Sequence, residues 1–99
     1  MEMNMEYVHV TQSDRLEALL QEKLDKLHRK YDWVIRADVF LKNMNKTGED
    51  EMSCGIRLSA PGPRLYAETS SPTFESAIGE TIRDLERQLE KRKDKMISH

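Results

Sequence analysis

The chain has 99 residues and a mass of 11.6 kDa, with 37% hydrophobic and 34% charged residues. This length allows one domain, residues 1–99, with a single hydrophobic core and no second lobe that could enclose a large cleft. The formal net charge is −2, so any affinity for an anionic partner must come from the distribution of the charges rather than from their sum.

Cysteine content and the first residues bound the compartment. Cys54 is the one cysteine in the sequence, which excludes an internal disulfide and a cysteine-rich metal site and is typical of a reducing compartment. The first ten residues lack the basic start and apolar block of a signal peptide, and no apolar run approaches membrane-spanning length. We therefore expect a cytoplasmic protein that does not associate with membranes.

The first two predicted elements are a strand and a helix. Apolar and polar side chains alternate over residues 1–7, which predicts a half-buried strand. Ser13 is placed to cap a helix that ends at Asp32 and Trp33. The apolar residues of this helix recur at three- and four-residue steps, and they are Leu16, Leu20, Leu24, Leu27 and Tyr31.

Three further strands are predicted in the middle of the chain. Their inward-facing residues alternate with polar ones, and they are Ile35, Ala37, Val39 and Leu41, then Met52, Cys54, Ile56 and Leu58, then Leu65, Ala67 and Thr69. A long solvated hairpin loop, Asn43–Glu51, separates the first two of these strands. The sequence Ala-Pro-Gly-Pro at 60–63 predicts a tight turn in which Gly62 adopts a positive φ.

The last predicted element is a helix that Ser71 or Thr73 would cap. Its apolar stripe consists of Phe74, Ile78, Ile82, Leu85, Leu89 and Met96. The order of elements is therefore β-α-β-β-β-α, in which a right-handed crossover makes the first two strands parallel and both helices cover the apolar sheet face. This order predicts an α+β two-layer sandwich, with a four-stranded mixed sheet, two helices packed on one face and the other face open to solvent.

Basic residues are sorted to one flank of each predicted helix. At about 100° per residue, Arg15, Lys23, Lys26 and Lys30 share a flank of the first helix, and Arg87, Lys91 and Lys95 share a flank of the second, opposite Glu86 and Glu90. Arg92 points near the apolar stripe, where the helix runs past the end of the sheet. Two neighbouring basic flanks would form a patch or groove that suits a phosphate backbone. The alternative is that these charges are only solvated and pair along their own helices.

The sequence gives no pattern of an enzyme, a cofactor site or a metal site. The glycines are too scattered for a phosphate loop, the histidines lack metal-ligand spacing, and no carboxylate pair lies in an apolar pocket. Cys54 belongs to the inward set of a strand, so we expect a buried thiol rather than a nucleophile. Phe40 and Tyr66 project from the polar sheet face, where aromatic residues of some RNA-binding modules stack bases, but the basic-glycine-aromatic signature of the RRM is missing.

Two segments and the order of elements resemble the ribosome hibernation promoting factor family, also called ribosome-associated inhibitors or sigma-54 modulation proteins. The segments are KLDKLHRKYD at 23–32 and LERQLEKRKDK at 85–95, and the resemblance covers essentially the whole chain. The chain departs from the family at Arg83-Asp84, where the family often has Asp-Lys, and at Thr73, which replaces the usual Asp at the start of the second helix. It resembles the short form, without the C-terminal dimerisation domain of the long form.

The resemblance implies a non-enzymatic factor that binds the small ribosomal subunit in the mRNA and tRNA channel and inhibits translation in stationary phase or stress. Its partners would be rRNA and nearby ribosomal proteins, and the free protein would be monomeric. The basic residues that would neutralise rRNA phosphates are Lys23, Lys26, Lys30, Arg87, Lys91, Arg92, Lys93 and Lys95. The older family name leaves a second hypothesis open, which is a protein-interaction module that modulates a transcription factor.

Overall fold

The computed structural model describes residues 1–44 and 51–97 and confirms the predicted order of elements. The elements are β1 (Glu2–Val8), α1 (Asp14–Lys30), β2 (Arg36–Asn43), β3 (Met52–Ser59), β4 (Leu65–Ser71) and α2 (Phe74–Ile97). Most of the predicted loop Asn43–Glu51 lies outside the described residues.

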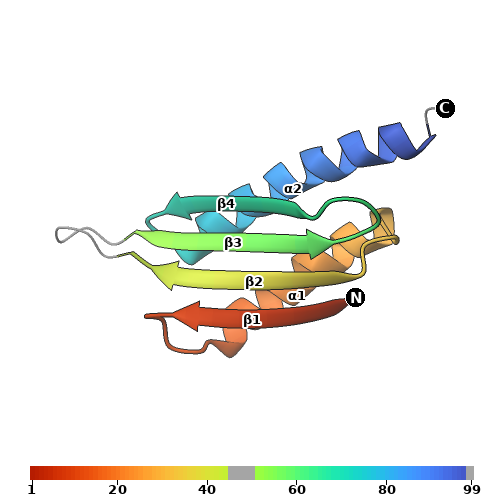
Figure 1. Cartoon of the computed structure of the whole chain (residues 1–99). Coiled ribbons are helices and arrows are strands. Elements are labelled where there is room, and N and C mark those ends of the chain that lie inside the picture. The colour runs from red at the N-terminus through yellow and green to blue at the C-terminus, as the bar shows by residue number, and fades with distance from the viewer. Residues whose placement is uncertain (45–50, 98–99) are drawn as a thin grey trace.

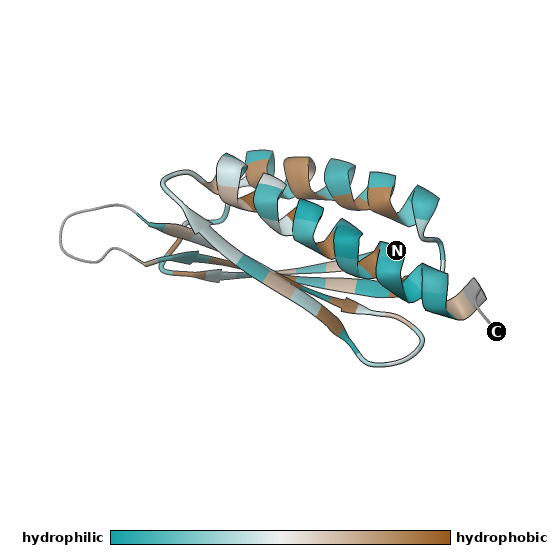
Figure 2. Cartoon of the chain, turned by 90° about the horizontal axis from the view of Figure 1, so that it is seen from above, coloured by the Kyte–Doolittle hydropathy of each residue, from teal (hydrophilic) through white to brown (hydrophobic). Residues whose placement is uncertain are grey.

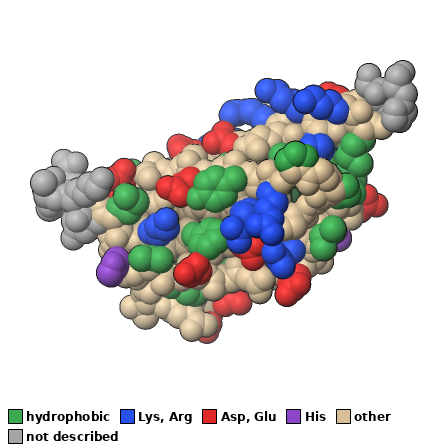
Figure 3. All heavy atoms as spheres, viewed as in Figure 1, with side chains coloured by type: hydrophobic (Ala, Val, Ile, Leu, Met, Phe, Trp, Pro, Cys, Tyr) green, Lys and Arg blue, Asp and Glu red, His purple; other side chains and the backbone are tan. Residues whose placement is uncertain are grey.

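The four strands form one mixed sheet with the spatial order β1-β2-β3-β4. β1 runs parallel to β2, while β2, β3 and β4 pair antiparallel in sequence (Figure 1). Both helices lie on the same side of this sheet, as the view from above shows (Figure 2). The opposite sheet face carries a mixture of charged and hydrophobic side chains (Figure 3). The structure is thus the two-layer α+β sandwich that the hydrophobic pattern predicts.

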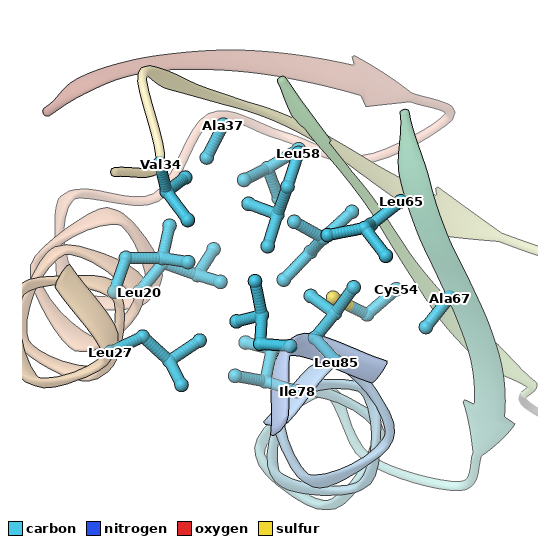
Figure 4. Close-up of a cluster of buried hydrophobic side chains, with 14 of the residues drawn as sticks. Leu20, Leu27, Val34, Ala37, Cys54, Leu58, Leu65, Ala67, Ile78 and Leu85 are labelled. Carbon is cyan, nitrogen blue, oxygen red and sulfur yellow. The ribbon is translucent and has the colours of Figure 1, made fainter. Parts of the chain in front are cut away.

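The core fills the space between the helices and the sheet. Leucines of α1 and the Ile78 and Leu85 side chains of α2 point toward the strand residues between them (Figure 4). Leu20, Leu24, Ile56, Ile78 and Leu85 are all fully enclosed. Because these residues follow the helical period in the helices and the period of two in the strands, each element turns one apolar face inward.

Side-chain caps and a glycine turn set the element boundaries. The Ser13 hydroxyl accepts a hydrogen bond from the Leu16 N–H at 3.2 Å, and the Thr73 hydroxyl accepts one from the Ser76 N–H at 3.2 Å. Thr73, not Ser71, is therefore the side chain that caps α2. Gly62 has a φ of 95°, as predicted for the turn between β3 and β4.

Two residues expected to face the core are exposed. Ile35 is 66% exposed because β2 begins only at Arg36, and the Ile35 N–H instead donates to the Ser59 carbonyl at 2.8 Å. Met96 is 42% exposed because α2 continues past the end of the sheet (Figure 1). The periodicity of a helix persists beyond the surface that it packs against, so the pattern alone could not show where burial ends.

Candidate nucleic-acid interface

A groove runs between α1 and α2 on the outer side of the helical layer. One hollow in it has a volume of about 340 Å³ and is lined by Lys30, Tyr31, Arg83, Glu86, Arg87 and Glu90. A second hollow of about 160 Å³ adjoins it and is lined by Lys23, Lys26, Leu27, Lys30, Ile82 and Glu86. The two hollows share Lys30 and Glu86, so they form one continuous groove.

The basic flank of α1 forms one wall of this groove. Lys23, Lys26 and Lys30 follow each other along the helix at steps of three and four residues, which places them on the same side. Lys26 pairs with Glu22 on its own helix at 3.5 Å, and Lys30 pairs with Glu86 of α2 at 3.6 Å. All four side chains are about half or more exposed, so these ion pairs are weak and their cations can exchange partners.

The other wall carries both signs of charge, since Arg83 and Arg87 of α2 line the larger hollow together with Glu86 and Glu90. The acidic flank of α2 faces α1, since Glu86 pairs with Lys30 and Glu90 accepts a hydrogen bond from the Tyr31 hydroxyl at 2.6 Å. Lys91 and Lys95 lie about 100° and 140° around the helix from Glu90. They therefore form a separate basic strip on the side of α2 away from α1, and Arg87 lies at the rim between the strip and the groove.

Tyr31 anchors the C-terminal half of α2 against the end of α1. Its side chain is fully buried, and Lys30 Nζ and Lys93 Nζ lie 5.6 and 6.0 Å from its ring centroid. Burial, the hydrogen bond to Glu90 and the charges of Glu90, Glu86 and Asp94 raise the pKa of Tyr31. The same hydrogen bond lowers the pKa of Glu90, assisted by the charges of Lys93 and Lys30. At neutral pH the pair is thus a protonated phenol that donates to a carboxylate.

Arg92 connects α2 to the turn between β3 and β4. Its two terminal nitrogens donate to the carbonyl oxygens of Pro61 and Pro63, each at 2.8 Å. Arg92 also packs closely over Gly62, because a Cβ added at this glycine would lie 3.1 Å from Arg92 Nη1. Among the eight basic residues named from the sequence, both arginines thus have hydrogen-bond partners: Arg92 holds the turn between β3 and β4, and Arg87 Nη1 donates to Asp84 of its own helix at 2.9 Å.

The family model for the sigma 54 modulation protein / S30EA ribosomal protein family matches residues 3–97. The chain belongs to this family. No curated protein matches the sequence.

Solved structures of similar fold support the architecture. A ribosomal subunit interface protein from Coxiella burnetii has a TM-score of 0.83 and 22% identity, with 94% of this chain and 98% of that chain covered. The N-terminal domain of Thermus thermophilus Protein Y has a TM-score of 0.79 and 20% identity, with 92% and 98% covered. At this level of identity the likeness concerns the fold.

Sequence reasoning missed two contributions to the groove of this family member. The first is Arg83, which lines the larger hollow beside Arg87. The two arginines are four residues apart, a spacing that places them on the same side of a helix and could have indicated the contact. Tyr31 was assigned only to the apolar stripe, and its hydroxyl contact with Glu90 spans 59 residues, so no local pattern could show it.

Among the described residues, no group of His, Cys, Asp and Glu could hold a metal ion. Within residues 1–44 and 51–97, neither α1 nor α2 is long and apolar enough to cross a membrane.

Proposed function

We propose that the protein is a ribosome hibernation factor that binds rRNA of the small subunit in the mRNA and tRNA channel and inhibits translation in stationary phase or stress. It acts in the cytoplasm by occupying this channel, not by catalysis. Membership in the S30EA ribosomal protein family supports a ribosomal partner. One of the two similar structures is a ribosomal subunit interface protein, which agrees with this partner.

The observation that carries the proposal is the pair of basic rows on the helical layer of an acidic chain. One row is Lys23, Lys26 and Lys30 along the groove, and the other is Arg87, Lys91 and Lys95 along the outer strip of α2. Two separate rows suit a partner that presents more than one phosphate backbone, as folded rRNA does. Lys93 lies between them near Tyr31. Such contacts fix position on the RNA and do not read its sequence.

The test is co-sedimentation of the purified protein with purified small subunits. The variant Arg87→Glu with Lys91→Glu reverses two charges on exposed positions of α2 and is expected to abolish co-sedimentation at physiological salt. The matched control is Arg15→Glu with Arg29→Glu, which changes the net charge by the same amount at exposed positions of α1 that belong to neither row. Intact binding by the α2 variant, or equal loss with the control, would contradict the assignment of the α2 strip.

The second candidate is a module that modulates a transcription factor, and the family name 'sigma 54 modulation protein' supports it. A pull-down from nuclease-treated extract separates the two candidates. Retention of a transcription factor without ribosomal subunits would favour the second candidate, whereas capture that requires intact small subunits favours the first.

A further inference from the structure

The open face of the sheet carries an exposed tyrosine beside two arginines. Tyr66 of β4 is 46% exposed, and it pairs directly across the sheet with Arg57 of β3. Figure 3 looks onto this face and shows hydrophobic side chains next to Lys and Arg in its centre. Nearly half of this aromatic side chain is thus accessible beside positive charge.

Gly55 allows the Tyr66 ring to lie down on the sheet. A Cβ at Gly55 would lie 2.6 Å from the Tyr66 hydroxyl oxygen and 3.3 Å from Cζ, which is too close for a side chain there. The Tyr66 hydroxyl donates to Glu68, which fixes the ring in this orientation. The hydroxyl end of the ring therefore covers Gly55 of β3, and the side chain remains 46% exposed.

Asp38 fixes the two arginines beside this ring. Arg57 Nη2 and Arg36 Nε lie 3.3 and 3.4 Å from the same oxygen, Asp38 Oδ2, and Asn4 donates to the other oxygen at 3.2 Å. The Arg57 guanidinium also lies 5.6 Å from the Phe40 ring centroid. Two cations share one carboxylate, so the cluster has a net positive charge, and each guanidinium keeps further N–H donors for an anion.

We propose that this face binds an unpaired nucleotide of single-stranded RNA, with the base stacked on Tyr66 and the phosphate on Arg57 and Arg36. The direct pairing of Tyr66 with Arg57 places an aromatic plane and a cation within the span of one nucleotide. The base must be unpaired, because a base inside a duplex has no free π-face. Glu68 keeps its negative charge, but it pairs with Gly55, two residues along the ladder from the Tyr66–Arg57 pair, so the phosphate is expected on the side of Arg57 and Arg36.

RNA suits this face better than a protein partner does. Protein interfaces centre on pockets that enclose apolar anchors, whereas this face presents fixed charged side chains beside the ring. A flat aromatic ring beside fixed guanidinium groups is instead the arrangement of single-strand binding platforms. The inference uses the opposite face from the helical rows, so it does not rest on the proposed function.

The experiment measures binding of a fluorescent oligoadenylate of about ten nucleotides, within the usual site size of such platforms, by anisotropy. The background is the variant Arg87→Glu with Lys91→Glu, which reverses two of the three charges in the α2 row. In this background, Tyr66→Ala is expected to weaken binding about tenfold, whereas Tyr66→Phe keeps the stacking surface and changes it less than about twofold. Met96→Ala removes another exposed apolar side chain, on α2, and is the matched control.

Two further measurements protect the test against indirect effects. Arg57→Gln is expected to lower the slope of log affinity against log salt by about one, since one phosphate contact is lost. Amide chemical-shift changes on adding the oligomer are expected at Gly55, Arg57 and Tyr66. The proposal is overturned if Tyr66→Ala binds as the background protein does, if an abasic oligomer of equal length binds equally well, or if the shift changes map to α1 and α2 alone.

Discussion

Single residues on the open sheet face are organised by one carboxylate. Asp38 is 9% exposed and contacts Asn4 of β1, Arg36 of β2 and Arg57 of β3, so it connects three strands. Burial alone would raise the pKa of Asp38, but the hydrogen bond from Asn4 and the charges and hydrogen bonding of Arg36 and Arg57 outweigh it and lower the pKa. The ionised form is therefore the form that stabilises the fold.

This linkage makes Asp38→Asn a pH-dependent test. Since the folded pKa lies below the unfolded value of about 3.9, the contribution of Asp38 is complete above that value and is lost as pH falls through the folded pKa. Asp38→Asn is expected to lower the free energy of unfolding by about 1–3 kcal/mol at pH 7, because two arginines lose their shared carboxylate. Urea unfolding at several pH values measures this, and the gap between the two proteins should close in acid. A gap of equal size at low pH would contradict the linkage.

The sequence predicted the roles of residues whose partners lie a few positions away along the chain, and it did not predict contacts between residues far apart in the chain. The Ser13 cap and the buried face of Cys54 followed from spacing of a few residues, and both are confirmed. Burial also raises the pKa of the Cys54 thiol to about 12, which accords with an unreactive side chain. The Arg92 contacts with the carbonyls of Pro61 and Pro63 span 31 and 29 residues, and nothing in the helix pattern specifies such a partner.

At the scale of elements, Thr81 attaches α2 to the sheet at a buried point. Its hydroxyl lies 2.9 Å from the Cys54 carbonyl of β3 and 2.8 Å from the Ala77 carbonyl of its own helix, and it also contacts the Thr69 hydroxyl of β4. Thr81 is fully enclosed, so these polar groups have no access to water. The leucines of α2 predicted that it covers this face of the sheet. The hydrogen bonds of Thr81 were not predicted, because Thr81 lies among the apolar residues of the stripe.

Thr81→Val tests this attachment, because valine keeps the shape of the side chain and removes the hydroxyl. The expected loss is about 1–3 kcal/mol in the free energy of unfolding, since the buried hydrogen bond to the Cys54 carbonyl and the contact with the Thr69 hydroxyl are lost. Thr81→Ser is the control that keeps the hydroxyl and removes a methyl group, at a cost of about 1 kcal/mol. Chemical denaturation of the three proteins measures both. A valine variant as stable as the parent would show that the hydrogen bonds contribute little.

For the whole molecule, the sequence predicted the fold better than the candidate site. Periodicity fixes which face of each element is apolar, and six such elements in this order pack in few ways, so the sandwich follows from it. The rotation of α2 about its axis was less certain, since a turn of a few tens of degrees decides whether Glu86 and Glu90 or Lys91 and Lys95 meet α1. The buried leucines of α2 and the hydrogen bond from Tyr31 to Glu90 turn the acidic flank toward α1. The basic surface is consequently two rows rather than one groove.

Because the surface charges take little part in core packing, salt is expected to weaken binding strongly and to change stability little. The Lys–Glu and Arg–Asp pairs of the helices are largely exposed, so the melting temperature is expected to change little with salt. If the two rows neutralise about six phosphates, small-subunit affinity falls about a thousandfold between about 50 and 200 mM salt. Sedimentation and thermal unfolding at matched salt concentrations measure the two. Parallel losses of both would mean that salt acts on the fold.

Because α2 extends past the end of the sheet, its last residues can be substituted more freely than the residues that pack against the sheet. The helix has 24 residues, or about 36 Å, while β4 has seven, or about 24 Å, and Leu89 is the last fully buried side chain of α2 among those described. Beyond the Arg92 clamp, Lys95 is constrained by helix propensity and charge but not by packing. Substitutions at such a position alter the attraction to an anionic partner without a cost in folding, so affinity at this end of the molecule can be tuned, in evolution or by design, independently of stability.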